Sequence, residues 1–213
     1  DMDRVLKIGI IGCGGIATQK HMPALSKLKN VELVAFCDII EERAQKACKN
    51  FGTAEAKVYT DYKELLKDET IEVIHVCTPN RSHSFISIDA MEAGKHVMCE
   101  KPMAKTSEEA LAMVEAAKRT GKKLTIGYQN RYREDSMYLK RACEDDALGE
   151  VYYAKAHALR RRAVPTWGVF LNEEEQGGGP LIDIGTHALD LTLWMMNNLS
   201  LIHISEPTRL QLI

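Results

Sequence analysis

Residues 5–17 read VLKIGIIGCGGIA, and this stretch decides the fold. Its branched apolar residues predict a buried β-strand, and the glycines after them predict a tight turn that opens a helix over residues 15–28. Within the turn, Gly12, Gly14 and Ala17 match the pattern G-x-G-x-x-G/A. Such a turn lets the phosphates of a dinucleotide approach the main chain at the N-terminus of a helix.

Strands and helices alternate from this stretch to residue 127. The predicted strands cover residues 31–37, 58–59, 73–77, 96–99 and 124–127, and the predicted helices between them cover residues 41–51, 61–67, 84–93 and 107–120. The strands are apolar on both faces, which is typical of a parallel sheet covered by helices on both sides. The predicted fold class is therefore α/β, with a doubly wound parallel sheet of the Rossmann type over residues 1–126.

The pattern changes after residue 127. The expected elements are a helix over 137–144, a strand with one wet face over 151–159, an irregular polar stretch over 160–179, and a helix that ends near Met196. These elements predict the beginning of a second domain over residues 127–198, an α/β substrate domain with an open sheet that is incomplete in this chain.

The composition excludes several classes of protein. A formal net charge of −2 leaves no basic footprint for nucleic acid or an anionic membrane, and no apolar run is long enough to span a membrane. The six cysteines are scattered without a CxxC pair, which favours free thiols in a reducing compartment over a cysteine metal site. We therefore expect a cytoplasmic protein with neither nucleic-acid nor membrane partners.

Asp38 stands at the end of the second predicted strand, where dinucleotide-binding folds place an acid. Its carboxylate is expected to accept hydrogen bonds from the ribose hydroxyls of an adenosine. It would repel a 2′-phosphate, and Ile39 beside it offers no positive charge. The sequence thus favours NAD over NADP as the cofactor, and the alternative is a doubly wound domain that binds something else or nothing.

A second polar pair lies in residues 177–191, which read GGGPLIDIGTHALDL. Asp183 and His187 stand four residues apart, so on a helix they point the same way. A carboxylate beside an imidazole could form a reaction centre, or it could be a capping pair on a surface helix. Metal ligation by the pair lacks a third ligand at useful spacing, so no metal is predicted.

Four motifs together resemble the Gfo/Idh/MocA family of NAD(P)-dependent oxidoreductases. They are GIIGCGGIA at 9–17, VCTPN at 76–80 followed by His83, EKP at 100–102, and the stretch at 177–191. The resemblance covers residues 5 to about 198. It implies a Rossmann domain followed by a domain built on a large open sheet that often forms the oligomer contact, so we expect the full-length protein to be a homo-oligomer.

The resemblance also implies roles for individual residues. Lys101 would lie beside the nicotinamide and the substrate, preceding a cis peptide bond, while Asp183 and His187 would complete the site from the second domain. The expected cofactor-binding residues are Gly12, Gly14, Gly15, Ile16, Asp38, Thr78, Pro79, Asn80, His83, Glu100, Lys101 and Gln129. Oxidation of a secondary alcohol agrees with these residue types, because His187 suits a base and Lys101 suits the stabilisation of a developing oxyanion.

The expected activity is hydride transfer between NAD and a secondary alcohol of a sugar, cyclitol or related polyol. One alternative is an NAD-dependent glycoside hydrolase of the same family, in which NADH would not accumulate. The other is a non-catalytic dinucleotide sensor, against which Lys101 and His187 both argue.

Residues 199–209 read LSLIHISEPTR and resemble a translated sequencing adapter. We therefore expect native sequence to end near Asn198 and residues 199–213 to be foreign. A second domain that lacks its remaining strands would leave an open sheet edge, so the truncated chain itself is expected to be inactive or prone to aggregate.

Overall fold

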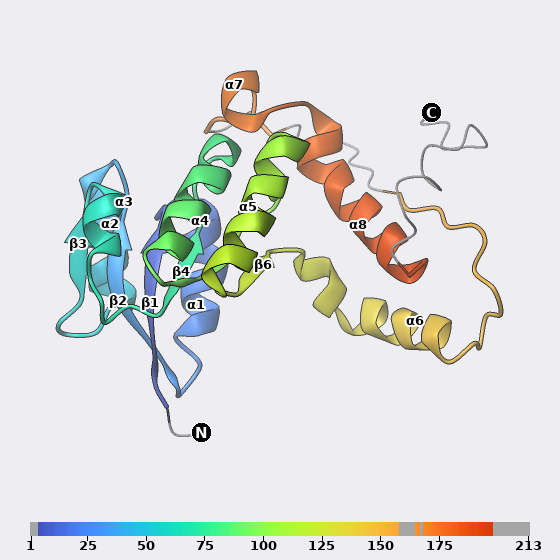
Figure 1. Cartoon of the computed structure of the whole chain (residues 1–213), viewed down its shortest axis with the longest axis horizontal. Helices are drawn as coiled ribbons and strands as arrows, with labels where there is room; N and C mark the ends of the chain where they lie inside the picture. The colour runs from blue at the N-terminus through green and yellow to red at the C-terminus, as the bar shows by residue number, and fades with distance from the viewer. Residues whose placement is uncertain (1–3, 158–164, 167, 198–213) are drawn as a thin grey trace. The chain divides into compact units, whose positions relative to one another are not determined.

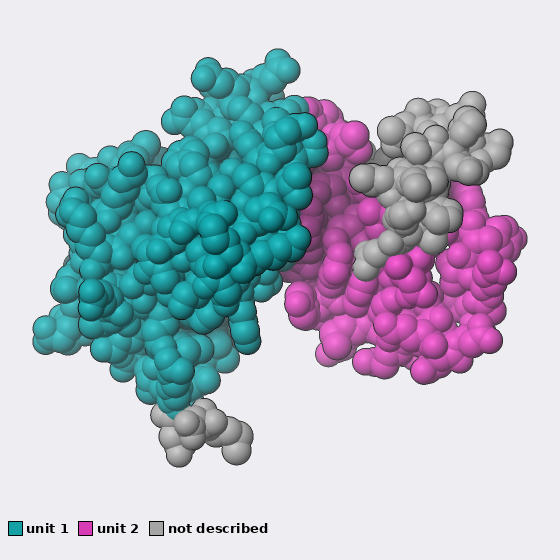
Figure 2. Space-filling view, in the orientation of Figure 1, with its two compact units in different colours: residues 1–127, 166–178 teal, residues 128–165, 179–213 magenta. Residues whose placement is uncertain are grey.

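The computed structural model describes residues 4–157, 165–166 and 168–197 (Figure 1). Figure 2 shows the two compact units into which the chain divides. The first unit comprises Asp1–Gly127 and Thr166–Gly178, and the second comprises Tyr128–Pro165 and Gly179–Ile213. Thr166–Gly178, which the sequence placed in the second domain, thus belongs to the first unit by its contacts.

The first unit is built on a six-stranded sheet in the order β3-β2-β1-β4-β5-β6. Its strands are β1 (Leu6–Ile11), β2 (Val31–Cys37), β3 (Lys57–Tyr59), β4 (Val73–Val76), β5 (His96–Cys99) and β6 (Leu124–Ile126). All five pairings are parallel. The strand order reverses between β1 and β4, and ligands of such sheets bind at the carboxyl ends of the strands at this point.

Helices connect the strands and cover both faces of the sheet. They are η1 (Ala17–His21) continuing into α1 (Met22–Leu25), α2 (Glu41–Phe51), α3 (Tyr62–Leu66), α4 (His83–Glu92) and α5 (Ser107–Thr120). Ile10 packs in a core cluster with Met22 of α1, whereas its neighbour Ile11 packs in a second cluster with Met91 of α4 and Met113 of α5. Successive residues of a strand point to opposite faces, so the sheet is buried on both sides. This confirms the predicted doubly wound α/β fold.

The regular secondary structure in the described part of the second unit is helical. It contains η3 (Gln129–Tyr132), α6 (Glu134–Glu144), η4 (Leu181–Gly185) and α8 (Thr186–Met195). Lys140 of α6 joins the two longer helices, because its Nζ donates hydrogen bonds to the carbonyl of Trp194 at 2.9 Å and to Oδ1 of Asn197 at 2.9 Å.

The strand predicted over residues 151–159 is wrong within the described residues, because residues 151–157 adopt no regular structure. An alternating sequence becomes a strand only when a neighbouring strand supplies hydrogen bonds, and every described strand of the chain lies in the first unit. Residues 158–159 and the tail at 199–213 lie outside the described residues. None of the described helices is long and apolar enough to cross a membrane.

Candidate dinucleotide and catalytic site

The glycine turn between β1 and η1 lies at the carboxyl end of the sheet. Gly12 has φ +91°, and a Cβ added there would lie 2.6 Å from the main-chain carbon and oxygen of Cys77. Only glycine fits this position, because any other residue would be strained and would collide with the end of β4. A Cβ added to Gly14 would meet no described atom within 4 Å, so space is open above this residue.

Beyond the glycines, the chain turns directly into a helix. Thr18 N–H donates to the carbonyl of Gly14 at 3.0 Å, so the preceding N–H groups, those of Gly15, Ile16 and Ala17, belong to the first turn. N–H groups of a first turn have no acceptor within their own helix and attract anions. The open space above Gly14 and these donors together fit a pyrophosphate.

Asp38 follows β2 and its side chain reaches back to the glycine turn. It is 8% exposed. Its Oδ2 accepts a hydrogen bond from the Cys13 N–H at 2.9 Å, and its Oδ1 accepts one from the Ile40 N–H at 2.9 Å. An ionised carboxylate has further lone pairs, so both oxygens can still accept from a ribose diol. Ile39 beside it is 87% exposed and carries no charge, and these residues therefore fit an NAD adenosine.

The thiol of Cys13 lies beside this carboxylate but is not a nucleophile. Burial, followed by the charge of Asp38, raises the pKa of Cys13 to about 12. The thiol therefore stays protonated near neutral pH, and its Sγ donates weakly to the carbonyl of Cys37 at 3.6 Å.

Thr78, Pro79 and Asn80 follow β4 at the same edge of the sheet. The side chain of Asn80 is buried and its Nδ2 donates to the main-chain carbonyl of Gln176 at 3.0 Å and to Oε1 of Gln176 at 2.8 Å. Its amide N–H groups therefore bind another segment of the first unit. The cofactor contact expected of Asn80 stays a prediction.

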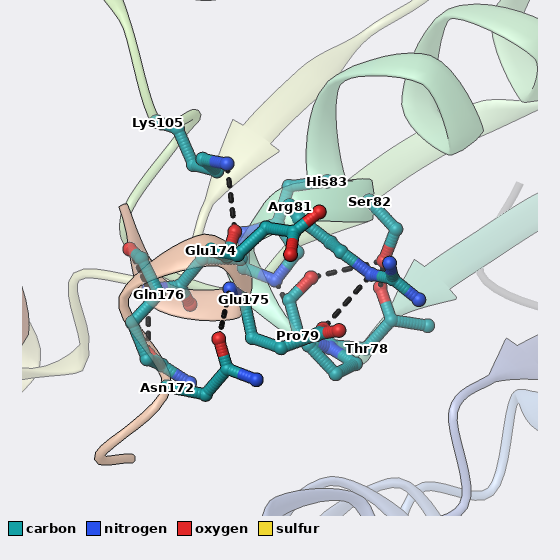
Figure 3. Close-up of polar contacts among 11 residues, drawn as sticks. Thr78, Pro79, Arg81, Ser82, His83, Lys105, Asn172, Glu174, Glu175 and Gln176 are labelled. Atoms are coloured by element: carbon teal, nitrogen blue, oxygen red, sulfur yellow. Dashed lines mark hydrogen bonds and ion pairs between the residues drawn. The ribbon is translucent and has the colours of Figure 1, made fainter. Parts of the chain in front are cut away.

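Gln176 ends α7 (Glu173–Gln176), a short helix that the sequence analysis treated as irregular. Figure 3 shows how it is held. Arg81 Nε forms an ion pair with Glu175 Oε2 at 2.8 Å, and Lys105 Nζ donates to the carbonyl of Glu174 at 2.7 Å. Asn172, whose Oδ1 accepts from the Glu175 N–H, acts as the N-cap. Asn before a run of acids and a closing glycine is a helix signal, and it could have revealed α7.

His83 begins α4 and is 1% exposed. Its Nδ1 lies 2.7 Å from the carbonyl oxygen of Pro102 and its Nε2 lies 2.9 Å from that of Thr78. Burial lowers the pKa of His83, although both carbonyl contacts act in the opposite direction. The ring thus links the loop after β4 to the loop after β5, and both of its nitrogens face main-chain carbonyls. The cofactor contact expected of His83 stays a prediction.

Glu100 and Lys101 follow β5, and the Lys101–Pro102 peptide bond is cis, as expected. Glu100 Oε1 lies 2.7 Å from His21 Nε2, and Glu100 Oε2 accepts the main-chain N–H of Lys101 at 3.2 Å. His21 Nδ1 in turn lies 3.0 Å from His75 Nδ1. Sequence reasoning gave no role to either histidine, because nothing in their spacing indicates this contact.

The second unit contains the other three predicted site residues. Gln129 begins η3, Asp183 lies in η4, and His187 lies in the first turn of α8. The rings of His187 and Tyr128 meet edge to face with 6.3 Å between their centroids, and the Tyr128 hydroxyl lies 3.0 Å from Thr186 Oγ1.

Arg131 and Asp190 form an ion pair within the same unit. Arg131 Nε donates to Asp190 Oδ2 at 2.8 Å, and Arg131 Nη2 contacts the other carboxylate oxygen. The guanidinium also lies 5.5 Å from the ring centroid of Trp194. Among the described residues, no group of three or more His, Cys, Asp or Glu side chains could hold a metal ion.

The sheet, the glycine turn and the acid after β2 define a dinucleotide-binding domain of the Rossmann class. Residues 6–128 match the family model described as "Oxidoreductase family, NAD-binding Rossmann fold", and residues 136–207 match the model described as "GFO/IDH/MocA C-terminal domain". The chain belongs to the Gfo/Idh/MocA family of oxidoreductases, which confirms the resemblance seen in the motifs. The second match runs to residue 207, past Asn198.

Curated relatives include several sugar and cyclitol dehydrogenases. The chain is 42% identical over 191 residues to D-glucoside 3-dehydrogenase of Escherichia coli (strain K12), covering 90% of this chain and 54% of that protein. It is 36% identical over 197 residues to glucose-6-phosphate 3-dehydrogenase of Bacillus subtilis (strain 168), covering 90% and 54%. It is 30% identical over 193 residues to inositol 2-dehydrogenase of Salmonella typhimurium, covering 90% and 55%. The chain spans about half the length of these relatives.

Solved structures agree with the fold. The WlbA dehydrogenase from Bordetella pertussis, in complex with NADH and UDP-GlcNAcA, matches with a TM-score of 0.80 and 27% identity, over 91% of this chain and 56% of that one. The aldose-aldose oxidoreductase from Caulobacter crescentus, complexed with glycerol, matches with a TM-score of 0.77 and 28% identity, over 91% and 58%.

Proposed function

We propose that this protein transfers a hydride between NAD and a secondary alcohol of a sugar, cyclitol or related polyol. The observation that carries the proposal is the joint arrangement of Gly14 and Asp38, which offers open space for a pyrophosphate and a carboxylate for the adenosine ribose. The names of the curated relatives, which are glucoside, glucose 6-phosphate and inositol dehydrogenases, support the choice of a sugar hydroxyl as the substrate.

When bound, NAD supplies a hydride acceptor. The residues of this chain would supply the remaining chemistry. We assign His187 as the base that takes the hydroxyl proton, because imidazole titrates near neutrality. Lys101 would stabilise the developing negative charge on the substrate oxygen, and Asp183 would orient His187 or the substrate hydroxyl.

The cofactor contacts follow from the same geometry. Gly12, Gly14, Gly15 and Ile16 would hold the pyrophosphate, and Asp38 would hold the ribose. Thr78, Pro79 and Asn80 would line the nicotinamide half at the carboxyl edge of the sheet. The further residues of the site would be His83, Glu100, Lys101 and Gln129. That the full-length protein is a homo-oligomer and that it lies in the cytoplasm remain predictions.

The test uses the full-length protein. D-glucosides, glucose 6-phosphate and inositols are screened with NAD and with NADP, and the absorbance of the reduced cofactor is measured. We expect NADH to accumulate with at least one of these substrates. His187→Ala should reduce kcat by at least about a hundredfold, a typical contribution of a general base, and should leave NAD affinity unchanged. Release of a sugar without accumulation of NADH would instead identify a glycoside hydrolase, and NAD binding without turnover would identify a sensor.

A further inference from the structure

A buried chain of three ionisable side chains lies in the first unit beneath the loop that carries Lys101. His75 of β4 contacts His21 of η1 through their Nδ1 atoms at 3.0 Å, and His21 Nε2 contacts Glu100 Oε1 at 2.7 Å. The side chains of His21 and Glu100 are only 8% and 13% exposed. The proposed chemistry uses neither histidine, so the chain needs its own explanation.

The hydrogen bonds constrain where the protons lie. An ionised carboxylate only accepts, so His21 Nε2 must carry a proton. One proton must also lie between the two Nδ1 atoms, because two acceptor lone pairs would repel each other at 3.0 Å. Burial, followed by the proximity of His21, lowers the pKa of His75 to about 4, which makes His75 the neutral partner near neutral pH.

Glu100 is held ionised despite its burial. Burial alone would raise the pKa of Glu100, but the hydrogen bond and charge of His21, together with the N–H and charge of Lys101, outweigh it and bring the pKa below its ordinary value. Each carboxylate oxygen of Glu100 thus accepts a different hydrogen bond. Oε1 accepts from His21 Nε2, and Oε2 accepts from the main-chain N–H of Lys101 at 3.2 Å.

The end of β6 closes over this carboxylate. A Cβ added to Gly127 would lie 3.3 Å from Glu100 Oε1 and 3.1 Å from the terminal methyl of Met98. The main chain at Gly127 therefore packs directly on the carboxylate. It leaves little freedom for Glu100 to turn away from Lys101.

The remaining ionisable groups near Glu100 are uncharged near neutral pH. Burial raises the pKa of the thiols of Cys77 and Cys99, and burial lowers the pKa of His83. The negative charge of Glu100 therefore interacts mainly with His21 and Lys101.

We propose that His21 and Glu100 are positioning residues for Lys101. The imidazole of His21 keeps the buried carboxylate ionised, and the carboxylate fixes the peptide N–H of the residue whose side chain acts on the substrate oxygen. The inference rests on the role proposed for Lys101, adds His21 to the site and gives Glu100 a positioning role within it.

The first test needs no variant. In the unmodified chain, heteronuclear NMR follows the amide of Lys101 and the carboxyl carbon of Glu100 as the pH is lowered. The proposal requires both resonances to move with one common midpoint, below the ordinary pKa of a glutamate. A Lys101 amide that does not follow the titration of Glu100 would overturn it.

The second test removes the imidazole. His21→Leu deletes the donor, and His21→Gln keeps an N–H group near the position of Nε2. In His21→Leu the midpoint of Glu100 should move upward and hydrogen exchange of the Lys101 amide should accelerate about tenfold, the usual effect of losing a charged hydrogen bond. In His21→Gln the rate should change by less than about threefold. Equal rates in both variants would contradict the proposal.

Internal and matched controls separate positioning from loss of the fold. The amide of Val97 in β5, which donates to the Lys123 carbonyl at 2.8 Å, should exchange at an unchanged rate. Glu100→Gln keeps the shape of the side chain, loses its charge and should accelerate the Lys101 amide in the same way as His21→Leu. If His21→Leu does not fold, this variant and His21→Gln decide the question.

Turnover gives an independent measurement. With a substrate that yields NADH, His21→Leu should lower kcat about tenfold while KM for NAD changes by less than about twofold, because the residue acts through Lys101 and not on the cofactor. If the unmodified full-length protein forms no NADH with any sugar, the proposed function fails, whereas the NMR titration still decides the positioning role.

Discussion

The amide of Asn80 donates two hydrogen bonds to Gln176, one to its main-chain carbonyl and one to its side-chain oxygen, although ninety-six residues separate them in sequence. Both side chains are buried, at 8% and 7% exposure. The loop after β4, which would line the cofactor, is therefore held by a segment that lies beyond the end of the sheet in sequence. A buried amide that lost this partner would be costly.

Gln176→Leu should destabilise the first unit and weaken NAD binding. It removes the side-chain acceptor of Asn80 and leaves a buried donor short of one partner, which costs about 1–3 kcal/mol. Urea unfolding and NAD titration measure the two effects. Glu175→Gln is the matched control, because it removes only the partly exposed ion pair with Arg81 and should cost less than about 1 kcal/mol. Equal losses in both variants would show that the Asn80 contact has no special weight.

Gly12→Ala and Gly14→Ala should fail in different ways. At Gly12 the new methyl group meets the main chain of Cys77 in a left-handed backbone, so the unit should lose at least about 3 kcal/mol of stability. At Gly14 the methyl group enters open space, so stability should change by less than about 0.5 kcal/mol. NAD affinity should nevertheless fall about tenfold or more in Gly14→Ala, because the methyl group occupies the path of the pyrophosphate. Unimpaired NAD binding in Gly14→Ala would place the cofactor elsewhere.

Asp38→Asn should change the choice between NAD and NADP. The amide keeps the shape of the side chain and one oxygen to accept the Cys13 N–H, loses the acceptor of the Ile40 N–H, and has no charge to repel a 2′-phosphate. NAD affinity should fall about tenfold and the preference for NAD over NADP should shrink. Calorimetric titration with both nucleotides checks the ratio, and an unaltered ratio would contradict the ribose assignment.

His75 should make the first unit sensitive to moderate acid. Burial and the neighbouring His21 lower its pKa to about 4 in the folded protein, whereas an unfolded histidine titrates near about 6.5. Between these values the unfolded chain binds more protons, so the free energy of unfolding falls as the pH is lowered, by an amount on the order of 3 kcal/mol. Urea unfolding at a series of pH values measures the loss, and His75→Asn should remove it.

In the same experiment, Asp68 affects stability in a different pH range. Hydrogen bonds from Thr70 and Lys57 lower its pKa to about 2, so its contribution to stability is lost only below about pH 4. A loss of stability above that pH that persists in His75→Asn would show that another group titrates.

The parts of the structure that could be predicted are those that local chemistry determines. The strand before Gly12, the turn and the helix after it are encoded within one short stretch, and Asp38 follows at the end of the next strand. Apolar runs bounded by glycines and polar turns likewise marked the strands of the sheet, and each was found within a residue or two of its predicted place.

The parts that escaped prediction join residues far apart in the chain. Nothing near His21 indicates that its ring meets Glu100, and nothing near Asn80 indicates Gln176. Such polar contacts exist only once the sheet has brought the carboxyl ends of β1, β4 and β5 together. The alternation in residues 151–157 failed for the opposite reason, because a local pattern without a neighbouring strand forms none in the described part of the second unit.

Because Thr166–Gly178 packs in the first unit, the first unit cannot finish folding until this segment has been synthesised. Chains leave the ribosome from the N-terminus, and domains generally fold as they emerge. All six strands of the sheet are synthesised before Gln176, so a nascent sheet must wait for the acceptors of the Asn80 amide. The nucleotide-binding unit therefore acquires its complete set of hydrogen bonds only after part of the next unit has been translated.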